Sequence, residues 1–250
     1  MNVKWTFVAV FAVVMLSNGC ATTKSISGQA AESQGIVTGF LNKTMVADGK
    51  ERAYAVYVPR NYDRAQGWPL IVFLHGIGER GNDGLLPTDV GIGHAIRKHP
   101  ERFPCVVVFP QCPGLGFWDR AVSHIEKALE QTRAEYNIDP NRIYLTGISL
   151  GGYATWMLGA KRTDVYAALM PICGGGKEED ATALAALPIW AFHGAEDDVV
   201  KPAESRKMVE AVKKAGGQIK YTEIPKAKHN SWDDAYGDAK TIQWLLKQKK

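Results

Sequence analysis

Residues 142–158, RIYLTGISLGGYATWML, decide the expected fold. The stretch opens with a short apolar run that is typical of a buried strand and closes with a helical segment. Between them, residues 147–151 (GISLG) match the G-x-S-x-G turn that exposes a serine between a strand and a helix. We therefore predict that Ser149 is a catalytic nucleophile and that the Leu150 N–H is an oxyanion-hole donor. An incidental serine in a glycine-rich turn is the alternative, because the pentapeptide is common by chance.

The alternation of strand and helix patterns continues on both sides of this turn. Buried-strand runs are expected at residues 69–74, 105–109, 167–172 and 187–192, with a more polar strand at 218–224. Helical faces between or after them are marked by Ile125, Leu129, Thr132 and Tyr136, by Met208, Ala211, Val212 and Ala215, and by Ile242, Leu245 and Leu246. This pattern predicts an α/β fold with a mostly parallel central sheet and helices on both faces. Ligands of such folds bind beyond the carboxyl ends of the strands.

The beginning of the chain predicts an export signal. Residues 5–16 are apolar and uncharged, follow Lys4, and are too short a run to span a bilayer. We interpret residues 1–20 as a signal peptide with Cys20 lipidated, and residues 21–35 as a flexible tether. Ordinary signal cleavage nearby and a buried N-terminal helix are the alternatives. The protein is therefore expected to be exported, as a membrane-anchored lipoprotein or in a periplasmic or secreted form.

Residues 36–250 are expected to form a single catalytic domain. Two predicted strands, 36–46 and 51–59, flank the hairpin signal Ala47-Asp48-Gly49, and no internal repeat or second linker follows. The 250-residue chain has 46% hydrophobic and 22% charged residues, which is ordinary for a globular protein. Its formal charge of +4 is too small to indicate nucleic-acid binding, and the oligomeric state stays open.

Three acidic residues after the strand at 187–192 are candidates for the carboxylate that orients a catalytic histidine. We choose Asp197, because the valines that follow it can then pack back as the loop closes. Asp198 is the alternative, and Glu196 is expected to face solvent. His229 follows the last predicted strand and is the predicted base, which gives the chain order Ser, Asp, His of nucleophile-elbow hydrolases.

The other histidines are expected to have structural or surface roles. His75 and His193 lie at strand ends, and His94, His99 and His124 are expected at the surface, in or beside helices. No two histidines have the spacing of a metal-binding motif such as H-x-x-x-H. We therefore predict no metal and no cofactor.

The segment HGIGERG at 75–81 follows a buried strand and is expected to supply the second oxyanion donor. Glycines let this backbone approach the substrate closely. We assign the donor to the Ile77 N–H, with Gly76 as the alternative. Glu79 and Arg80 are expected to form a salt bridge within the loop, in preference to a contact with substrate.

Cysteines and tryptophans also follow predicted strands. Cys105 lies within a strand and is expected to be a buried free thiol, whereas a disulfide between Cys112 and Cys173 is left open. Trp118 and Trp232 are candidates for an aromatic wall around an acyl or feruloyl group, with plain packing as the alternative.

These segments together resemble the α/β-hydrolase family, over roughly residues 50–248. The resemblance is carried by HGIGERG, FPQCP, LTGISLGGYATWMLGA, PICGGG, FHGAEDDVV and HNSWDDAY. More closely, the chain is similar to bacterial secreted esterases often labelled predicted peptidases or phospholipase/carboxylesterase-like proteins, which are related to feruloyl, acetylxylan and polyhydroxybutyrate-type esterases. The resemblance implies a metal-free serine esterase with Ser149, Asp197 and His229 as its triad and Ile77 and Leu150 as oxyanion donors.

The expected activity is hydrolysis of short-chain or aromatic carboxylic esters, of the feruloyl or acetyl type, through an acyl-enzyme intermediate. The segment between residues 172 and 187 is too short for a large lid, which argues against a lipase acting at oil interfaces. A serine peptidase with the same triad and a non-catalytic surface protein on a hydrolase fold are the alternatives. The expected partner is a small-molecule or polysaccharide-linked ester.

Overall fold

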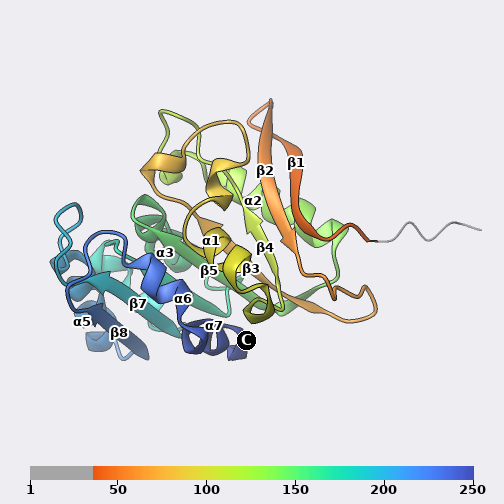
Figure 1. Ribbon diagram of the computed structural model, residues 1–250. Coiled ribbons are helices and arrows are strands. Elements are labelled where there is room, and N and C mark those ends of the chain that lie inside the picture. Colours follow the sequence, from red (N-terminus) through yellow and green to blue (C-terminus); the bar gives the residue numbers. More distant parts are fainter. Residues whose placement is uncertain (1–35) are drawn as a thin grey trace, which may run out of the picture. The chain divides into compact units, whose positions relative to one another are not determined.

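The computed structural model describes residues 36–250, so the predicted signal peptide, the predicted lipidation at Cys20 and the predicted tether lie outside the described residues. Eight strands form one sheet in the order β1-β2-β4-β3-β5-β6-β7-β8 (Figure 1). They are β1 (Gly39–Ala47), β2 (Lys50–Val58), β3 (Trp68–Leu74), β4 (Val106–Phe109), β5 (Ile138–Ile148), β6 (Ala168–Ile172), β7 (Ile189–Gly194) and β8 (Ile219–Ile224). β2 pairs antiparallel with both β1 and β4, and all other neighbouring strands are parallel. The prediction of a mostly parallel sheet is confirmed.

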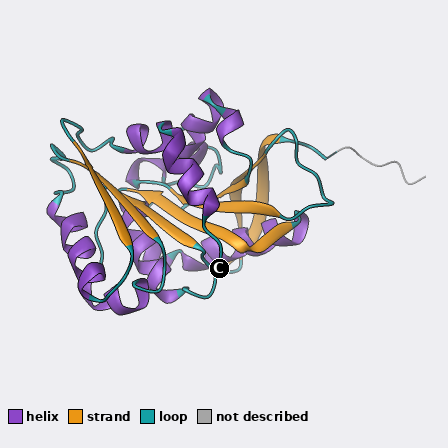
Figure 2. Ribbon diagram, turned by 90° about the horizontal axis from the view of Figure 1, so that it is seen from below, coloured by secondary structure: helices purple, strands orange, loops and turns teal. Residues whose placement is uncertain are grey.

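Helices cover both faces of this sheet, as Figure 2 shows. They are α1 (Ile92–Lys98), α2 (Val122–Glu135), α3 (Leu150–Lys161), α4 (Ala181–Leu184), α5 (Ala203–Lys214), α6 (Trp232–Gly237) and α7 (Ala239–Lys247). The side chains of β3 alternate between two cores. Leu70, Val72 and Leu74 pack with α2, α3 and α5, whereas Ile71 and Phe73 pack with α1, α6 and α7. Because successive side chains of a strand point to opposite faces, an entirely apolar strand needs a core on each side.

The predicted strands and the predicted hairpin are present, and the differences lie at the ends of elements. Asp48 and Gly49 both have positive φ, as a two-residue hairpin turn between twisted strands requires. β7 extends to Gly194, beyond the predicted end at residue 192, because His193 and Gly194 still pair with β8. The sequence does not predict α1, α4 and α6, which have 7, 4 and 6 residues and are too short to show a helical period.

The strand order determines where the loops of the site meet. β4 lies on one side of β3 and β5 lies on the other, so the order of the strands reverses at β3. Loops that leave the sheet at such a reversal diverge and open a crevice. The segment 75–81 follows β3, and Ser149 follows β5, so both lie beside this crevice.

The strand order also explains the state of the cysteines. Cys105, Cys112 and Cys173 are buried and free, so Cys112 and Cys173 are not joined. The strands that they follow, β4 and β6, are separated by β3 and β5. Three strand spacings amount to about 14 Å, whereas the Cα atoms of a disulfide lie within about 7 Å of each other.

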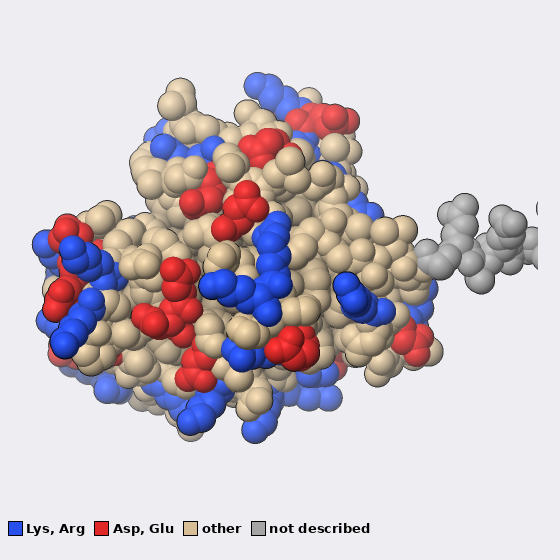
Figure 3. All heavy atoms as spheres, viewed as in Figure 1, with Lys and Arg blue, Asp and Glu red and all other residues tan. Residues whose placement is uncertain are grey.

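No helix among residues 36–250 is both long enough and apolar enough to cross a bilayer. On the face that Figure 3 shows, Lys and Arg side chains are interspersed with Asp and Glu. This face therefore lacks the basic stripe that is typical of nucleic-acid binding.

Candidate active site

Ser149 lies at the tip of the turn between β5 and α3. Its φ of 51° is in the left-handed region, which residues other than glycine rarely occupy. The glycines on either side allow the backbones to meet: a Cβ at Gly147 would collide with the Gly151 carbonyl, and a Cβ at Gly151 would collide with the Leu74 carbonyl. The turn therefore packs backbone against backbone and presents the Ser149 side chain at the start of α3.

The structure brings the three predicted triad residues into one hydrogen-bonded chain. His229 Nε2 lies 2.9 Å from Ser149 Oγ, and His229 Nδ1 lies 2.8 Å from Asp197 Oδ2. Asp197 comes from the loop after β7, and His229 comes from the loop between β8 and α6. The other two acidic residues considered for this position, Asp198 and Glu196, are exposed.

Asp197 is buried, and its two carboxylate oxygens have different partners. Oδ1 accepts hydrogen bonds from the N–H groups of Val199 and Val200, both at 2.9 Å, and Oδ2 accepts from His229. Burial acts to raise the pKa of Asp197, but the hydrogen bonds from His229, Val200 and Val199 outweigh it and hold this pKa below its ordinary value. Asp197 is therefore ionised and orients the His229 ring with Nδ1–H toward it.

A second imidazole, that of His193, lies against Asp197. Its Nε2 is 2.9 Å from the Val200 carbonyl oxygen and 3.3 Å from Asp197 Oδ2. Since a carbonyl oxygen only accepts, Nε2 carries a proton. Nδ1 lies 2.7 Å from Ser205 Oγ, and burial lowers the pKa of His193. The sequence predicts only a structural role at this strand end. The four-residue spacing from His193 to Asp197 is the available signal for the contact.

The two predicted oxyanion donors each begin a helix. Ile77 is the first residue of the 3-10 turn Ile77–Glu79, and Leu150 is the first residue of α3. N–H groups in the first turn of a helix have no acceptor within that helix and are free to bind an anion. Gly76, the alternative donor, is close to the nucleophile, because a Cβ placed on it would lie 3.6 Å from Ser149 Cβ.

His75 holds the loop after β3 in place through hydrogen bonds to backbone groups. Its Nε2 accepts a hydrogen bond from the Cys112 N–H at 3.0 Å, so Nδ1 carries the proton and donates to the Gly76 carbonyl at 2.6 Å. Burial lowers the pKa of His75 to about 4, so the ring is neutral near pH 7. Trp118 Nε1 donates to the His75 carbonyl at 3.1 Å. These bonds connect the loop after β3 to the segment after β4.

Glu79 and Arg80 do not form a salt bridge in the described part of the chain, so the predicted pairing is wrong. Arg80 instead donates to the carbonyl oxygens of Ile77 at 3.1 Å and Gly116 at 3.2 Å. Adjacent side chains at the end of a 3-10 turn point in different directions, so the guanidinium group reaches backbone acceptors in two loops. Burial raises the pKa of Glu79.

The expectation that His124 is a surface residue is also wrong. Its side chain is 2% exposed and lies between the Gln111 carbonyl and the carboxylate of Asp48 in the β1–β2 turn. The hairpin folds over this part of α2, which the helical pattern alone does not reveal. His94 is exposed and His99 is half-buried.

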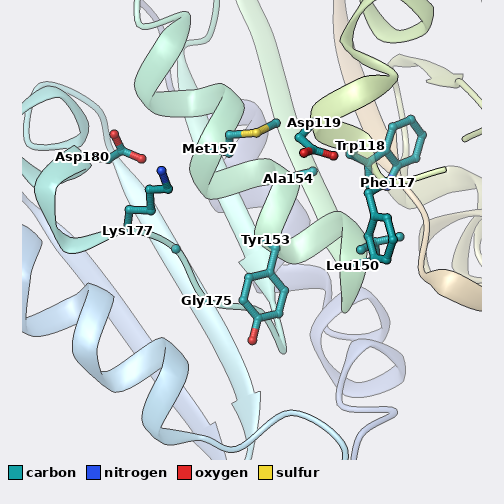
Figure 4. A pocket seen from close by; sticks show the side chains of 11 residues that line it. Phe117, Trp118, Asp119, Leu150, Tyr153, Ala154, Met157, Gly175, Lys177 and Asp180 are labelled. Atoms are coloured by element: carbon teal, nitrogen blue, oxygen red, sulfur yellow. The ribbon is translucent and has the colours of Figure 1, made fainter.

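A cavity of about 490 Å³ lies along α3, and Leu150, the residue after Ser149, is part of its wall (Figure 4). Its wall is mainly apolar and includes Phe117, Trp118, Leu150, Tyr153 and Met157. Figure 4 shows Lys177 and Asp180 at the end of the cavity away from Phe117 and Trp118. Leu150 connects the cavity to the turn that carries Ser149. A cavity of this size and lining is typical of small-molecule sites.

The two tryptophans considered for an aromatic wall lie in different places. Trp118 lines the cavity, whereas Trp232 is not among its lining residues and packs edge-on against His229, with ring centroids 5.4 Å apart. The sequence patterns do not single out Tyr153 and Met157. Both lie on one face of α3, one turn apart, and this spacing is the signal that could have indicated them.

Cys173 lies directly behind Ser149. Its Sγ accepts a hydrogen bond from the Ser149 N–H at 3.3 Å, and its φ of 41° is in the left-handed region. Burial raises the pKa of the thiol to about 12, so it is protonated near pH 7. β6 lies between β5 and β7, so the residue that follows β6 falls between Ser149 and Asp197.

Comparison with known proteins agrees with this fold. The dienelactone hydrolase family matches residues 115–236. The solved structure of a thermostable esterase is 34% identical, with a TM-score of 0.77 over 84% of this chain and 63% of that chain. The bifunctional acetylxylan esterase/xylanase of Neocallimastix patriciarum is 31% identical over 157 residues, which are 61% of this chain and 22% of that protein. Feruloyl esterase D of Neurospora crassa is 25% identical over 174 residues, 64% of this chain and 58% of that protein.

The chain belongs to the α/β-hydrolase superfamily, and its match within the superfamily is to the dienelactone hydrolase family. The resemblance predicted from the sequence motifs is therefore confirmed. The chain spans only about a fifth to three fifths of the length of these similar proteins.

Proposed function

We propose that this protein is a serine carboxylesterase that hydrolyses short-chain or aromatic carboxylic esters, of the acetyl or feruloyl type, through an acyl-enzyme intermediate. The observation that carries the proposal is the hydrogen-bonded chain from Ser149 Oγ through His229 to Asp197. Relatives named acetylxylan esterase and feruloyl esterase support ester hydrolysis as the reaction.

In the acylation half of the mechanism, Ser149 Oγ attacks the ester carbonyl while His229 Nε2 takes the serine proton. Asp197 holds the imidazole with Nδ1 protonated and stabilises the imidazolium that forms. The N–H groups of Ile77 and Leu150 bind the oxyanion, and each such donor contributes about 3–4 kcal/mol. His229 then protonates the leaving alcohol. In the second half of the mechanism, His229 takes a proton from a water molecule, which attacks the acyl group and releases the acid from Ser149.

The cavity along α3 supports the choice of acyl group. Phe117, Tyr153 and Met157 present aromatic and apolar surface in a cavity that begins at Leu150, next to Ser149, and such a surface suits a short or aromatic acyl group. Between β6 and β7 the chain forms only the 3-10 turn Glu178–Asp180 and α4, so the described residues hold no large lid over this cavity.

The first test is the substrate profile of the purified protein. Initial rates are measured on p-nitrophenyl acetate, butyrate, octanoate and palmitate, on methyl ferulate, and on a peptide p-nitroanilide. We expect the acetate, butyrate or ferulate ester to be cleaved fastest and the anilide to be cleaved little. Anilide cleavage at a comparable rate would favour a peptidase, and inactivity on every ester would favour a non-catalytic protein.

The second test is the nucleophile. We expect Ser149→Ala to lower turnover by at least about a thousandfold, because the attacking oxygen is lost, and to abolish labelling by a fluorophosphonate probe. Ser123→Ala is the matched control, since Ser123 donates to Asp48 in the β1–β2 turn and takes no part in the triad. A Ser149→Ala variant that kept a tenth of the wild-type rate would contradict the mechanism.

A further inference from the structure

We propose that Cys173, Asp197 and His229 form a binding site for a thiophilic divalent cation such as Zn²⁺ or Cd²⁺, and that a cation bound there blocks the triad. The blocking effect rests on the proposed function of the triad, whereas the binding itself does not. Such cations would therefore inhibit the protein, and its proposed activity does not require them.

The geometry of the three side chains carries this proposal. One ligand atom from each residue lies within 4.8 Å of the other two, so a sulfur, a carboxylate oxygen and an imidazole nitrogen converge on one point. Cys173 and Asp197 are buried, and His229 is partly exposed. The ligand atoms of a tetrahedral zinc site are about 3–4 Å apart, so small side-chain shifts complete the site.

The buried hydroxyl of Ser231 is a second feature that points to a ligand at this site. Its side chain is 1% exposed, and its Oγ has no hydrogen-bond partner among residues 36–250. The hydroxyl contacts the Cys173 thiol, which is only a weak hydrogen-bond partner. A buried hydroxyl that lacks a strong partner is costly, so a ligand that it could contact would relieve this cost. Ser231 is thus available as a fourth donor, directly or through a water molecule.

The donor set selects the class of cation. Thiolate and imidazole ligands favour Zn²⁺ and Cd²⁺ over Mg²⁺ and Ca²⁺, which prefer oxygen ligands alone. The Cys173 thiol is protonated in the free protein, so the thiol proton passes to solvent as the sulfur–metal bond forms.

A cation at this site would remove the base from the reaction. His229 Nδ1 is bonded to Asp197, and His229 Nε2 is bonded to Ser149. A metal on either nitrogen therefore replaces one of the two hydrogen bonds on which proton transfer depends.

The test is a Cd²⁺ titration of the purified protein with two readouts, the ultraviolet charge-transfer absorption of a thiolate–cadmium bond and the rate on p-nitrophenyl acetate. We expect Cd²⁺ and Zn²⁺ to inhibit where equal Mg²⁺ does not, and Cd²⁺ to produce the absorption band. Cys173→Ser should lose the band and raise the half-inhibitory concentration at least about tenfold, as loss of a metal-site group does. Cys105→Ser and Cys112→Ser, which change the other two buried free thiols, should behave as the wild type.

Three results would each overturn the proposal. They are inhibition of Cys173→Ser at the wild-type concentration of Cd²⁺, inhibition of the wild type without a thiolate band, and a thiolate band in an active wild type without inhibition. If Cys173→Ser does not fold, Ser231→Ala serves instead, and we expect it to weaken Cd²⁺ binding several-fold while the triad contacts remain. If the wild type hydrolyses no ester, the absorption band still tests the binding site, so failure of the proposed function is recognised separately.

Discussion

The dipeptide His-Gly directly follows β3 and ends β7, and the two histidines have different surroundings. His75 and His193 are completely buried, and burial lowers the pKa of each. The His75 ring bonds only to backbone, to the Gly76 carbonyl and the Cys112 N–H. The His193 ring instead reaches Asp197, the carboxylate of the proposed triad.

This difference separates two ways of supporting a site. The loop after β3 is held by neutral hydrogen bonds, so its contribution is the shape of a backbone that can bind an oxyanion. The loop after β7 is held around a charge, because Val199, Val200, His193 and His229 all approach Asp197. We expect changes in the β7 region to act mainly on turnover and changes in the β3 region to act mainly on stability.

The largest expected effect is at the charge itself. Asp197→Asn should lower turnover on p-nitrophenyl acetate by about a thousandfold to ten-thousandfold, because an amide can hold His229 in the wrong tautomer. Asp198→Asn is the matched control, since Asp198 is the exposed neighbour. A larger loss for Asp198→Asn would identify it as the triad carboxylate instead.

Acid should act through His75. The pKa of this ring is about 4 in the folded protein and 6.5 ordinarily, so its contribution to stability is complete above pH 6.5 and declines as the pH falls toward 4. The full loss corresponds to about 3 kcal/mol. Urea unfolding of the wild type and of His75→Gln, each at neutral pH and near pH 4, measures this loss of stability. We expect the wild type to lose more stability than the variant, and an equal loss would show that His75 is not responsible.

His193→Gln tests whether the second imidazole positions the triad. We expect kcat to fall about tenfold with KM unchanged, because Asp197 loses a neighbour that helps to hold it in place. A glutamine can still donate to the Val200 carbonyl, which keeps the loop closed. A fall in melting temperature without a change in kcat would restrict His193 to a structural role.

The smallest expected effect is that of a single hydrogen bond in the β3 region. Trp118→Phe removes the bond from Nε1 to the His75 carbonyl and should lower the free energy of unfolding by about 1 kcal/mol beyond the loss of ring volume. Trp156→Phe is the comparison variant, because Trp156 Nε1 is buried without a partner in the described part of the chain, so this variant loses similar ring volume and no hydrogen bond. Equal losses in the two variants would mean that the Trp118 bond contributes nothing.

The sequence predicts the strands and the three proposed triad positions because each depends on local patterns. A strand segment buried on both faces is apolar, as in β7 and the end of β5, and the proposed triad residues follow β5, β7 and the more polar β8. The contacts of His193, Cys173 and Arg80 are not predicted. They depend on the order of the strands in the sheet and on side-chain directions, and neither is encoded in the local period. The cavity wall is missed for the same reason, since Phe117 and Tyr153 come from different segments.

The glycine contacts around Ser149 have a consequence for how this protein can change. On the inner side of α3, the backbone of Gly151 lies against the Leu74 carbonyl, so no side chain takes part in fixing the nucleophile there. On the outer side of the same helix, Tyr153 and Met157 face the cavity. Substitutions at these two positions can reshape the binding surface while the backbone contacts keep Ser149 in register. Substitutions that favour a new ligand can therefore accumulate on one side of α3 without moving Ser149 Oγ.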